Sequence, residues 1–185
     1  MTTITTGDQP PFAPEQRFSS HTLAKHILIA VDDSDESVRA VQYVGTLLKD
    51  SRDVNVTLFH VLNPMPRELM EHGGSEDPET EHRLGEQLRK DQDEWVRAEG
   101  ALEYPILVNA LEQLGQTGFP LDHVTLKLGH ERDIADSILD EAKAGGYGTI
   151  VLSPHGPPGT KRLFSNRITD RLLRDLSGVA LWVLG

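Results

Sequence analysis

The sequence predicts a doubly wound α/β fold in which five parallel strands alternate with helices. Five short apolar runs have the length and composition of strands: residues 27–31, 54–62, 124–128, 149–152 and 179–184. The first run is apolar without alternation, which is typical of a strand covered on both faces. Segments with apolar residues at helical spacing separate the runs. Such regular alternation of strands and helices favours a parallel sheet with helices on both faces.

The first strand leads directly into a helix. Asp32 to Ser34 forms the turn, and Asp33 and Glu36 stand at the spacing of a capping box, which predicts that the helix begins there. One face of this helix is expected to carry Val38, Val41, Val44 and Leu48.

The stretch between the second and third strands predicts extra helical structure. Pro64 and Pro66 end the second strand, and residues 67–100 carry 11 acidic and 5 basic side chains, a net charge of −6. Apolar residues at helical spacing in this stretch predict a loop followed by an acidic amphipathic helix. Pro105 interrupts the pattern, which then resumes, so we expect Pro105 at the first position of a second helix.

The last third of the chain repeats the strand and helix alternation. Residues 124–128 alternate between apolar and polar, as an edge strand with one wet face would. A helix over 134–142 is expected to stop at Gly145-Gly146, and a final helix over 168–173 precedes the last strand.

Composition excludes several classes of protein. The 185 residues carry a net charge of −11 and contain no cysteine, which excludes disulfide frameworks and thiol chemistry. Net acidity argues against nucleic acid and anionic membranes as partners. Residues 1–22 predict a flexible tail before a domain at 23–185. They lack the apolar core of a signal peptide and no run spans a bilayer, so we expect a cytoplasmic protein.

A ligand site is expected at the carboxyl ends of the strands, where strand order reverses. With strand order 3-2-1-4-5, this point lies between Asp32, after the first strand, and the glycine loop 153–160, after the fourth. Residues 153–175 carry five basic and two acidic side chains, a local charge of +3. Glycine loops and helix N-termini can bind anions, although a simple connecting loop flanked by a solvated helix would show the same pattern.

Several enzyme and metal motifs are missing. The loop misplaces the lysine and hydroxyl of a P-loop, because Lys161, Arg162 and Leu163 stand where Gly, Lys and Ser or Thr are required. A receiver domain needs an aspartate at the end of the third strand, and none is present there. The histidines lack the spacing of a metal site, and no nucleophile elbow occurs.

Six ordered segments resemble the universal stress protein family. They are HILIAVDDSDES (26–37), TLFHVLNP (57–64), GHERDIADSI (129–138), LSPHG (152–156), KRLFSNRITDRLLR (161–174) and VALWVL (179–184). The resemblance covers residues 26–185 except the loosely matched stretch 64–121. It implies a five-stranded domain of strand order 3-2-1-4-5, often a homodimer joined through the last strand. The interface would contain Val179, Leu181, Trp182 and Val183.

The resemblance also implies an adenine-nucleotide site, with magnesium if the nucleotide is ATP. The motif of ATP-binding members, G-x-x-G-x9-G-[ST], keeps its second glycine here but has Ser153 for the first and Asn166-Arg167 for the last pair. Arg167 could bind a phosphate in a bidentate manner, and Asn166 could cap the last helix. The alternative is that Asn166 is only a helix cap and Arg167 an ordinary surface residue. The implied nucleotide-binding residues are Ala30, Asp32, Val61, Leu152, Ser153, Gly156, Asn166, Arg167 and Ile168.

Three functions remain open on the sequence. The first is a homodimeric protein that binds an adenine nucleotide, with no dedicated catalytic residues and at most slow incidental hydrolysis of ATP. The second is a nucleotide-free dimeric protein that binds a partner through the acidic segment 67–100. The weakest is a receiver-like protein phosphorylated on Asp32 or Asp33.

Overall fold

A single five-stranded sheet forms the centre of the molecule. The computed structural model describes residues 25–71, 74–130, 133–153 and 166–184, so the expected tail at 1–22 lies outside the described part. All neighbouring strands are parallel, in the order β3-β2-β1-β4-β5. This confirms the predicted fold class and strand order. The strands are β1 (His26–Ala30), β2 (Asn55–Val61), β3 (Val124–Gly129), β4 (Thr149–Leu152) and β5 (Ala180–Val183).

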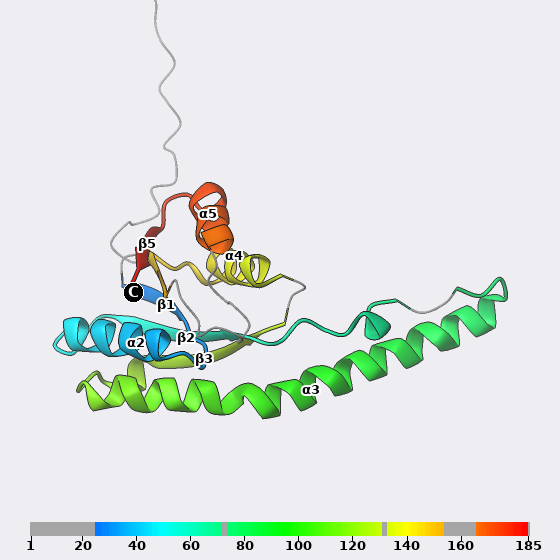
Figure 1. The fold of residues 1–185 in the computed structure, drawn as a ribbon, viewed down its shortest axis with the longest axis horizontal. Coiled ribbons are helices and arrows are strands. Elements are labelled where there is room, and N and C mark those ends of the chain that lie inside the picture. Colours follow the sequence, from blue (N-terminus) through cyan, green and yellow to red (C-terminus); the bar gives the residue numbers. More distant parts are fainter. Residues whose placement is uncertain (1–24, 72–73, 131–132, 154–165, 185) are drawn as a thin grey trace, which may run out of the picture.

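Helices cover both faces of this sheet (Figure 1). On one side lie α2 (Asp35–Leu48) and α3 (Pro78–Gln116), and on the other α4 (Ile134–Gly145) and α5 (Asn166–Asp175). The short 3₁₀ helices are η1 (Arg67–Leu69) and η2 (Leu121–His123). Strand β1 contributes to two separate hydrophobic cores, Ile27 and Ile29 to the α2–α3 side and Leu28 and Ala30 to the other. Its uninterrupted apolar run therefore reflects burial on both faces.

The helix after β1 begins one residue later than the capping-box spacing predicts. Ser34 is the N-cap, with extended backbone angles, and its hydroxyl accepts a hydrogen bond from the Ser37 amide. The prediction that Asp33 and Glu36 form the cap is wrong. Asp33 is exposed, whereas Ser34 is buried and held by the neighbouring Asp32 carboxylate, so tertiary burial selects between two adjacent capping residues.

The prediction of two helices between β2 and β3 is also wrong. Helix α3 runs through 39 residues with Pro105 in its interior. Packing of its C-terminal half compensates for the proline, because Leu107, Ala110 and Leu114 are buried against α2 and the sheet. Tertiary packing thus outweighs the local cost of an interior proline.

The N-terminal half of α3 extends beyond the end of the sheet, and the chain between β2 and α3 runs alongside it (Figure 1). Only Gly100, Leu107, Ala110 and Leu114 of α3 are buried, so its first 22 residues contribute no buried side chain to the core. None of the helices described here is long and apolar enough to cross a membrane.

The remaining boundaries follow the sequence pattern closely. Strand β3 is an edge strand whose side chains alternate between partly buried and exposed from Val124 to Leu128, as predicted. Helix α4 ends at Gly146, which has the left-handed backbone (φ 62°) of a glycine C-cap. At the opposite edge, β5 presents an unpaired strand within the described chain.

Candidate functional site

The predicted ligand residues after β1 and β4 meet at one edge of the sheet. These strands are parallel neighbours, with Ile29 beside Val151, so Asp32 and Ser153 leave the sheet next to each other. Both are nearly inaccessible, with 7% of Asp32 and 1% of Ser153 exposed. The sheet thus places a buried carboxylate and a buried hydroxyl at the point where strand order reverses.

The Asp32 carboxylate is held in place by the start of α2. Its Oδ1 accepts hydrogen bonds from the Ser34 amide (3.1 Å) and the Ser34 hydroxyl (2.5 Å). The Asp32 amide in turn donates to the Ser37 hydroxyl at 3.1 Å. Burial raises the pKa of Asp32, and the two bonds from Ser34 oppose that change. Because every hydrogen bond to this carboxylate within the described chain reaches Oδ1, Oδ2 is the oxygen available to a ligand.

Ser153 carries an unsatisfied polar atom. Its Oγ is the one buried side-chain oxygen or nitrogen among the described residues that has no hydrogen-bond partner. Leaving a buried hydroxyl unpaired costs roughly 1–3 kcal/mol, so such atoms are rare in folded proteins. An unpaired hydroxyl at this edge fits a site that is completed by a polar ligand.

Apolar residues surround these two polar groups. Ala30, Val61 and Leu152 are buried in the core on the α4–α5 side of the sheet, and Ile168 packs against the same core. Asp32 and Ser153 therefore lie where the buried apolar strands β1 and β4 end. Gly156 lies outside the described residues, and Asn166 and Arg167 open α5, so the described chain does not define their part of the site.

A buried histidine that the sequence did not single out connects this edge to α3. His60 Nδ1 lies 2.8 Å from the Val31 carbonyl oxygen, and Nε2 lies 2.9 Å from Glu103 Oε2. A carbonyl oxygen only accepts, so Nδ1 donates the hydrogen bond to Val31. A histidine inside an apolar strand run was the signal available in the sequence, but its partner lies 43 residues away.

One basic residue near the predicted anion site already has acidic partners. Arg171 forms ion pairs with Asp133, Asp136 and Asp175. The net charge of +3 in residues 153–175 therefore overstates the positive charge that is available to bind an anion. Arg171 is better described as a link between α5 and α4 than as a phosphate ligand.

The residues predicted to join two copies lie at the free edge of the sheet. Strand β5 pairs only with β4 within the described chain, and Val183 is 45% exposed. Leu181 and Val179 pack against one core and Trp182 against the other, which anchors the strand while leaving its outer edge open. No group of three or more metal-ligating side chains occurs among the described residues.

Comparison with known proteins identifies the family. The family model of the universal stress protein family matches residues 24–178. No curated protein is significantly similar in sequence to the chain.

Solved structures share the fold at low sequence identity. The universal stress protein UspA from Lactobacillus plantarum is 19% identical with a TM-score of 0.57, covering 87% of this chain and 97% of that one. A universal stress protein in complex with cAMP is 15% identical with a TM-score of 0.53, covering 87% and 96%. One from Archaeoglobus fulgidus in complex with dAMP is 14% identical with a TM-score of 0.51, covering 88% and 99%.

The family match spans every strand but β5, and β5 completes the same strand order in the structure. The fold, the sheet order and the matched sequence agree with one another. The chain therefore belongs to the universal stress protein family.

Proposed function

We propose that this protein binds an adenine nucleotide between the ends of β1 and β4. The observation that carries the proposal is the buried, unpaired Ser153 hydroxyl next to the buried Asp32 carboxylate. Asp32 Oδ2 supplies an acceptor for an amino or hydroxyl group of the nucleotide, and the Ser153 hydroxyl either donates or accepts. We expect the purine ring to lie at the apolar ends of these strands, near Ala30, Val61 and Leu152.

Two structural relatives support the choice of an adenine nucleotide, because one is described in complex with cAMP and another with dAMP. The same fold here ends its first and fourth strands in groups that can bind such a ligand. Magnesium would enter with the phosphates if the nucleotide is ATP. We propose binding rather than catalysis as the function of this site.

The proposed biological unit is a homodimer joined through β5, in keeping with a cytoplasmic stress or metabolic response. The free edge of β5 and the exposure of Val183 support pairing with a second copy. An edge strand that carries apolar side chains on both faces is unfavourable when its free edge is exposed to water. Pairing that edge with a second strand is favourable.

The proposal is tested on the purified full-length protein. Denaturing the fresh protein and analysing the released small molecules by mass spectrometry should detect an adenine nucleotide. ATP, cAMP and AMP are then titrated calorimetrically into stripped protein, with GTP as the control for base recognition. Saturable adenine-nucleotide binding supports the proposal, and absence of both released nucleotide and binding heat at millimolar concentration would refute it.

A second function is favoured by the projecting half of α3. That half carries most of the acidic segment 67–100 and extends past the sheet (Figure 1). A nucleotide-free protein of this fold would use it to bind a partner. Shortening the projection should then abolish partner binding, and the intact protein should neither release nor bind an adenine nucleotide, whereas the first function predicts nucleotide binding.

A further inference from the structure

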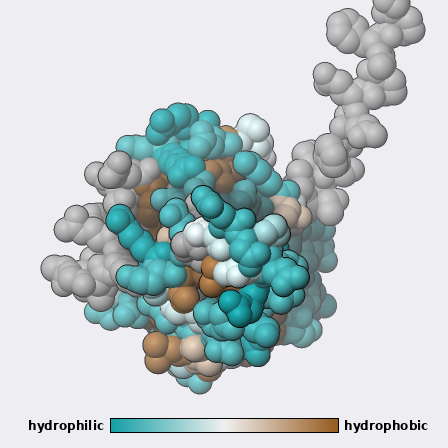
Figure 2. Space-filling model, turned by 90° about the vertical axis from the view of Figure 1, so that its right-hand side faces the viewer, coloured by the Kyte–Doolittle hydropathy of each residue, from teal (hydrophilic) through white to brown (hydrophobic). Residues whose placement is uncertain are grey.

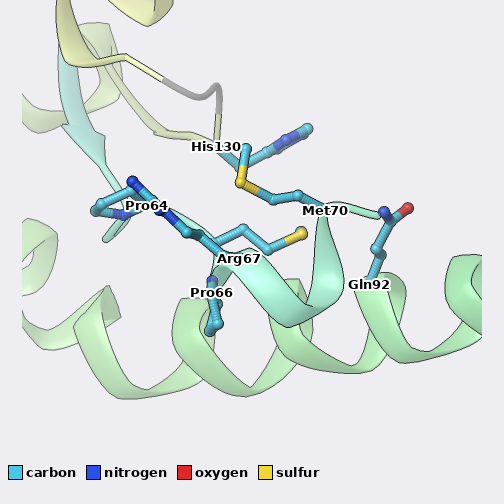
Figure 3. A pocket seen from close by; sticks show the side chains of 7 residues that line it. Pro64, Pro66, Arg67, Met70, Gln92 and His130 are labelled. Atoms are coloured by element: carbon cyan, nitrogen blue, oxygen red, sulfur yellow. The ribbon is translucent and has the colours of Figure 1, made fainter. Parts of the chain in front are cut away.

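A cavity of about 530 Å³ lies beyond the ends of β2 and β3, against α3. Figure 3 shows it between the chain that follows β2 and the upper surface of α3, with Gln92 rising from that helix. The described residues that line it are Pro64, Met65, Pro66, Arg67, Met70, Gln92 and His130. A volume of this size falls in the range of roughly 300–1,000 Å³ that is typical of small-molecule sites.

The cavity is built by a segment with restricted conformation. Pro66 has the extended backbone of a polyproline-like residue (φ −54°, ψ 145°) and leads into η1. Gln92 Nε2 donates a hydrogen bond of 2.7 Å to the Leu69 carbonyl oxygen, which fixes the end of η1 on α3. The stiffness of Pro66 and this hydrogen bond therefore hold the wall of the cavity at a fixed position relative to α3.

The lining has a definite chemical character. Met65 and Met70 are partly buried and, with the two prolines, form apolar walls. No carboxylate lines the cavity among the described residues, although residues 67–100 carry a net charge of −6, and the aromatic ring in the described lining is the His130 imidazole. The one fully charged lining group in the described chain is the Arg67 guanidinium, and the His130 imidazole adds a second polar group at the opposite wall.

This combination selects one class of ligand. Unbranched methionine side chains adapt to a flexible aliphatic chain. A guanidinium binds carboxylates in a bidentate manner. The face of the molecule shown in Figure 2 is largely hydrophilic, with small hydrophobic areas near the centre of the view. Packing an aliphatic chain against Met65 and Met70 would remove apolar surface from water, which is favourable.

We propose that this cavity binds a small organic anion with an aliphatic body, such as a medium-chain carboxylate, with Arg67 contacting its carboxylate. The site is separate from the proposed nucleotide site, because it lies at the β2 and β3 ends and shares no lining residue with the β1–β4 edge. The aliphatic chain lies between Met65 and Met70, and His130 borders the polar end.

The test uses decanoate as the probe and the full-length protein. Isothermal titration should show one saturable site for decanoate, and decanol, which has the same chain without the charge, should bind about tenfold more weakly. Arg67→Gln should weaken decanoate about tenfold and leave decanol unchanged. Arg83→Gln, an exposed arginine of α3 that does not line the cavity, is the matched control. Met70→Glu should weaken both probes by placing a carboxylate in the apolar wall.

Three results would overturn the proposal. The first is no saturable binding of decanoate at millimolar concentration by a protein whose thermal unfolding is cooperative. The second is equal loss of affinity in Arg67→Gln and Arg83→Gln. The third is stoichiometric displacement of decanoate by ATP, which would make the cavity part of the nucleotide site. Decanoate binding that persists in protein without any nucleotide affinity would support the cavity and refute only the nucleotide site.

Discussion

His60 and Glu103 show how a few buried side chains connect distant parts of the chain. His60 bonds to the Val31 carbonyl, one residue before Asp32, while its other ring nitrogen bonds to α3. One helical turn earlier in α3, Glu99 accepts a hydrogen bond from Asn63. These two contacts fix the exit of β2 against α3 and, through Val31, hold the backbone that presents Asp32.

Glu103→Leu should destabilise the fold by roughly 1–3 kcal/mol, because it leaves a buried His60 ring nitrogen without a partner. Urea unfolding measures the change. Glu112→Leu, at an exposed position of the same helix, controls for the loss of a glutamate. Equal stability of the two variants would show that the His60–Glu103 contact contributes nothing.

Asp32→Asn should stabilise the free protein increasingly as pH rises. The pKa of Asp32 is raised above 3.8 mainly by burial, so the folded state holds this proton more tightly than the unfolded state. As pH rises from 3.8 to the raised pKa, the wild-type protein therefore loses roughly 1.4 kcal/mol of stability per pH unit, and the asparagine variant does not.

Urea unfolding from pH 4 to 8 tests this difference. The advantage of Asp32→Asn should grow through the lower part of that range and then remain constant. Asp93→Asn, at an exposed position of α3, should show no such trend. A variant advantage that shrinks as pH rises would contradict the raised pKa of Asp32.

At the scale of secondary-structure elements, the contact between α2 and α3 explains how a helix with an internal proline stays continuous. Gly45 of α2 lies so close to α3 that an added Cβ would contact Thr117 Oγ1 and come within 2.8 Å of Leu114 Cδ1. This close approach buries Leu114 and Leu107 completely. The packing energy of that half of α3 offsets the missing backbone hydrogen bond at Pro105.

Gly45→Ala should therefore destabilise the protein by roughly 1–3 kcal/mol, even though alanine is the better helix former. Chemical denaturation measures the loss. Adding Thr117→Ala removes the atoms nearest to the new methyl group and should recover part of it. A stabilising effect of Gly45→Ala alone would show that the two helices are not tightly packed.

Local sequence patterns predicted the elements that depend on local chemistry. The apolar run of β1, the alternation of β3 and the glycine stop of α4 were all recognisable, because each follows from residues that are adjacent in sequence. The continuity of α3 could not be recognised in the sequence, because it depends on contacts of Leu107 and Leu114 with α2. The N-cap was misplaced by one residue for the same reason, because burial of Ser34 is a tertiary property.

The candidate site was predictable in part. Asp32 and Ser153 could be placed together from the strand order alone, because the ends of neighbouring parallel strands meet. The absence of a hydrogen-bond partner for the Ser153 hydroxyl could not be predicted from the sequence, because it depends on every surrounding atom. His60 and the cavity beside Arg67 were missed because their partners on α3 and after β3 lie far away in sequence.

At the scale of the whole molecule, charge and shape divide the protein into two regions. The sheet and its helices form the family fold, whereas residues 67–100, which include the projecting half of α3, carry −6 of the net charge of −11. The free β5 edge lies at the opposite side of the sheet order from β3. Dimerisation through β5 would therefore leave the projecting helix and the β2–β3 cavity accessible in both copies.

Val183→Lys should convert the proposed dimer to a monomer. Val183 is 45% exposed on the edge strand, and a lysine there places like charges across a pairing of two β5 strands. Light scattering after size exclusion measures the mass. Leu173→Lys, at an exposed position of α5, is the control and should leave the mass unchanged. A Val183→Lys protein that remains a dimer would locate the interface elsewhere.

The central claim is that Ser153 and Asp32 hold an adenine nucleotide, and calorimetric titration of ATP into Ser153→Ala protein tests it most directly. The hydroxyl is unpaired in the free protein, so the variant should be at least as stable as wild type yet bind ATP roughly tenfold more weakly. Ser177→Ala, at an exposed position after α5, should bind as wild type does. Unchanged ATP affinity in Ser153→Ala, or none in the wild-type protein, would contradict the account.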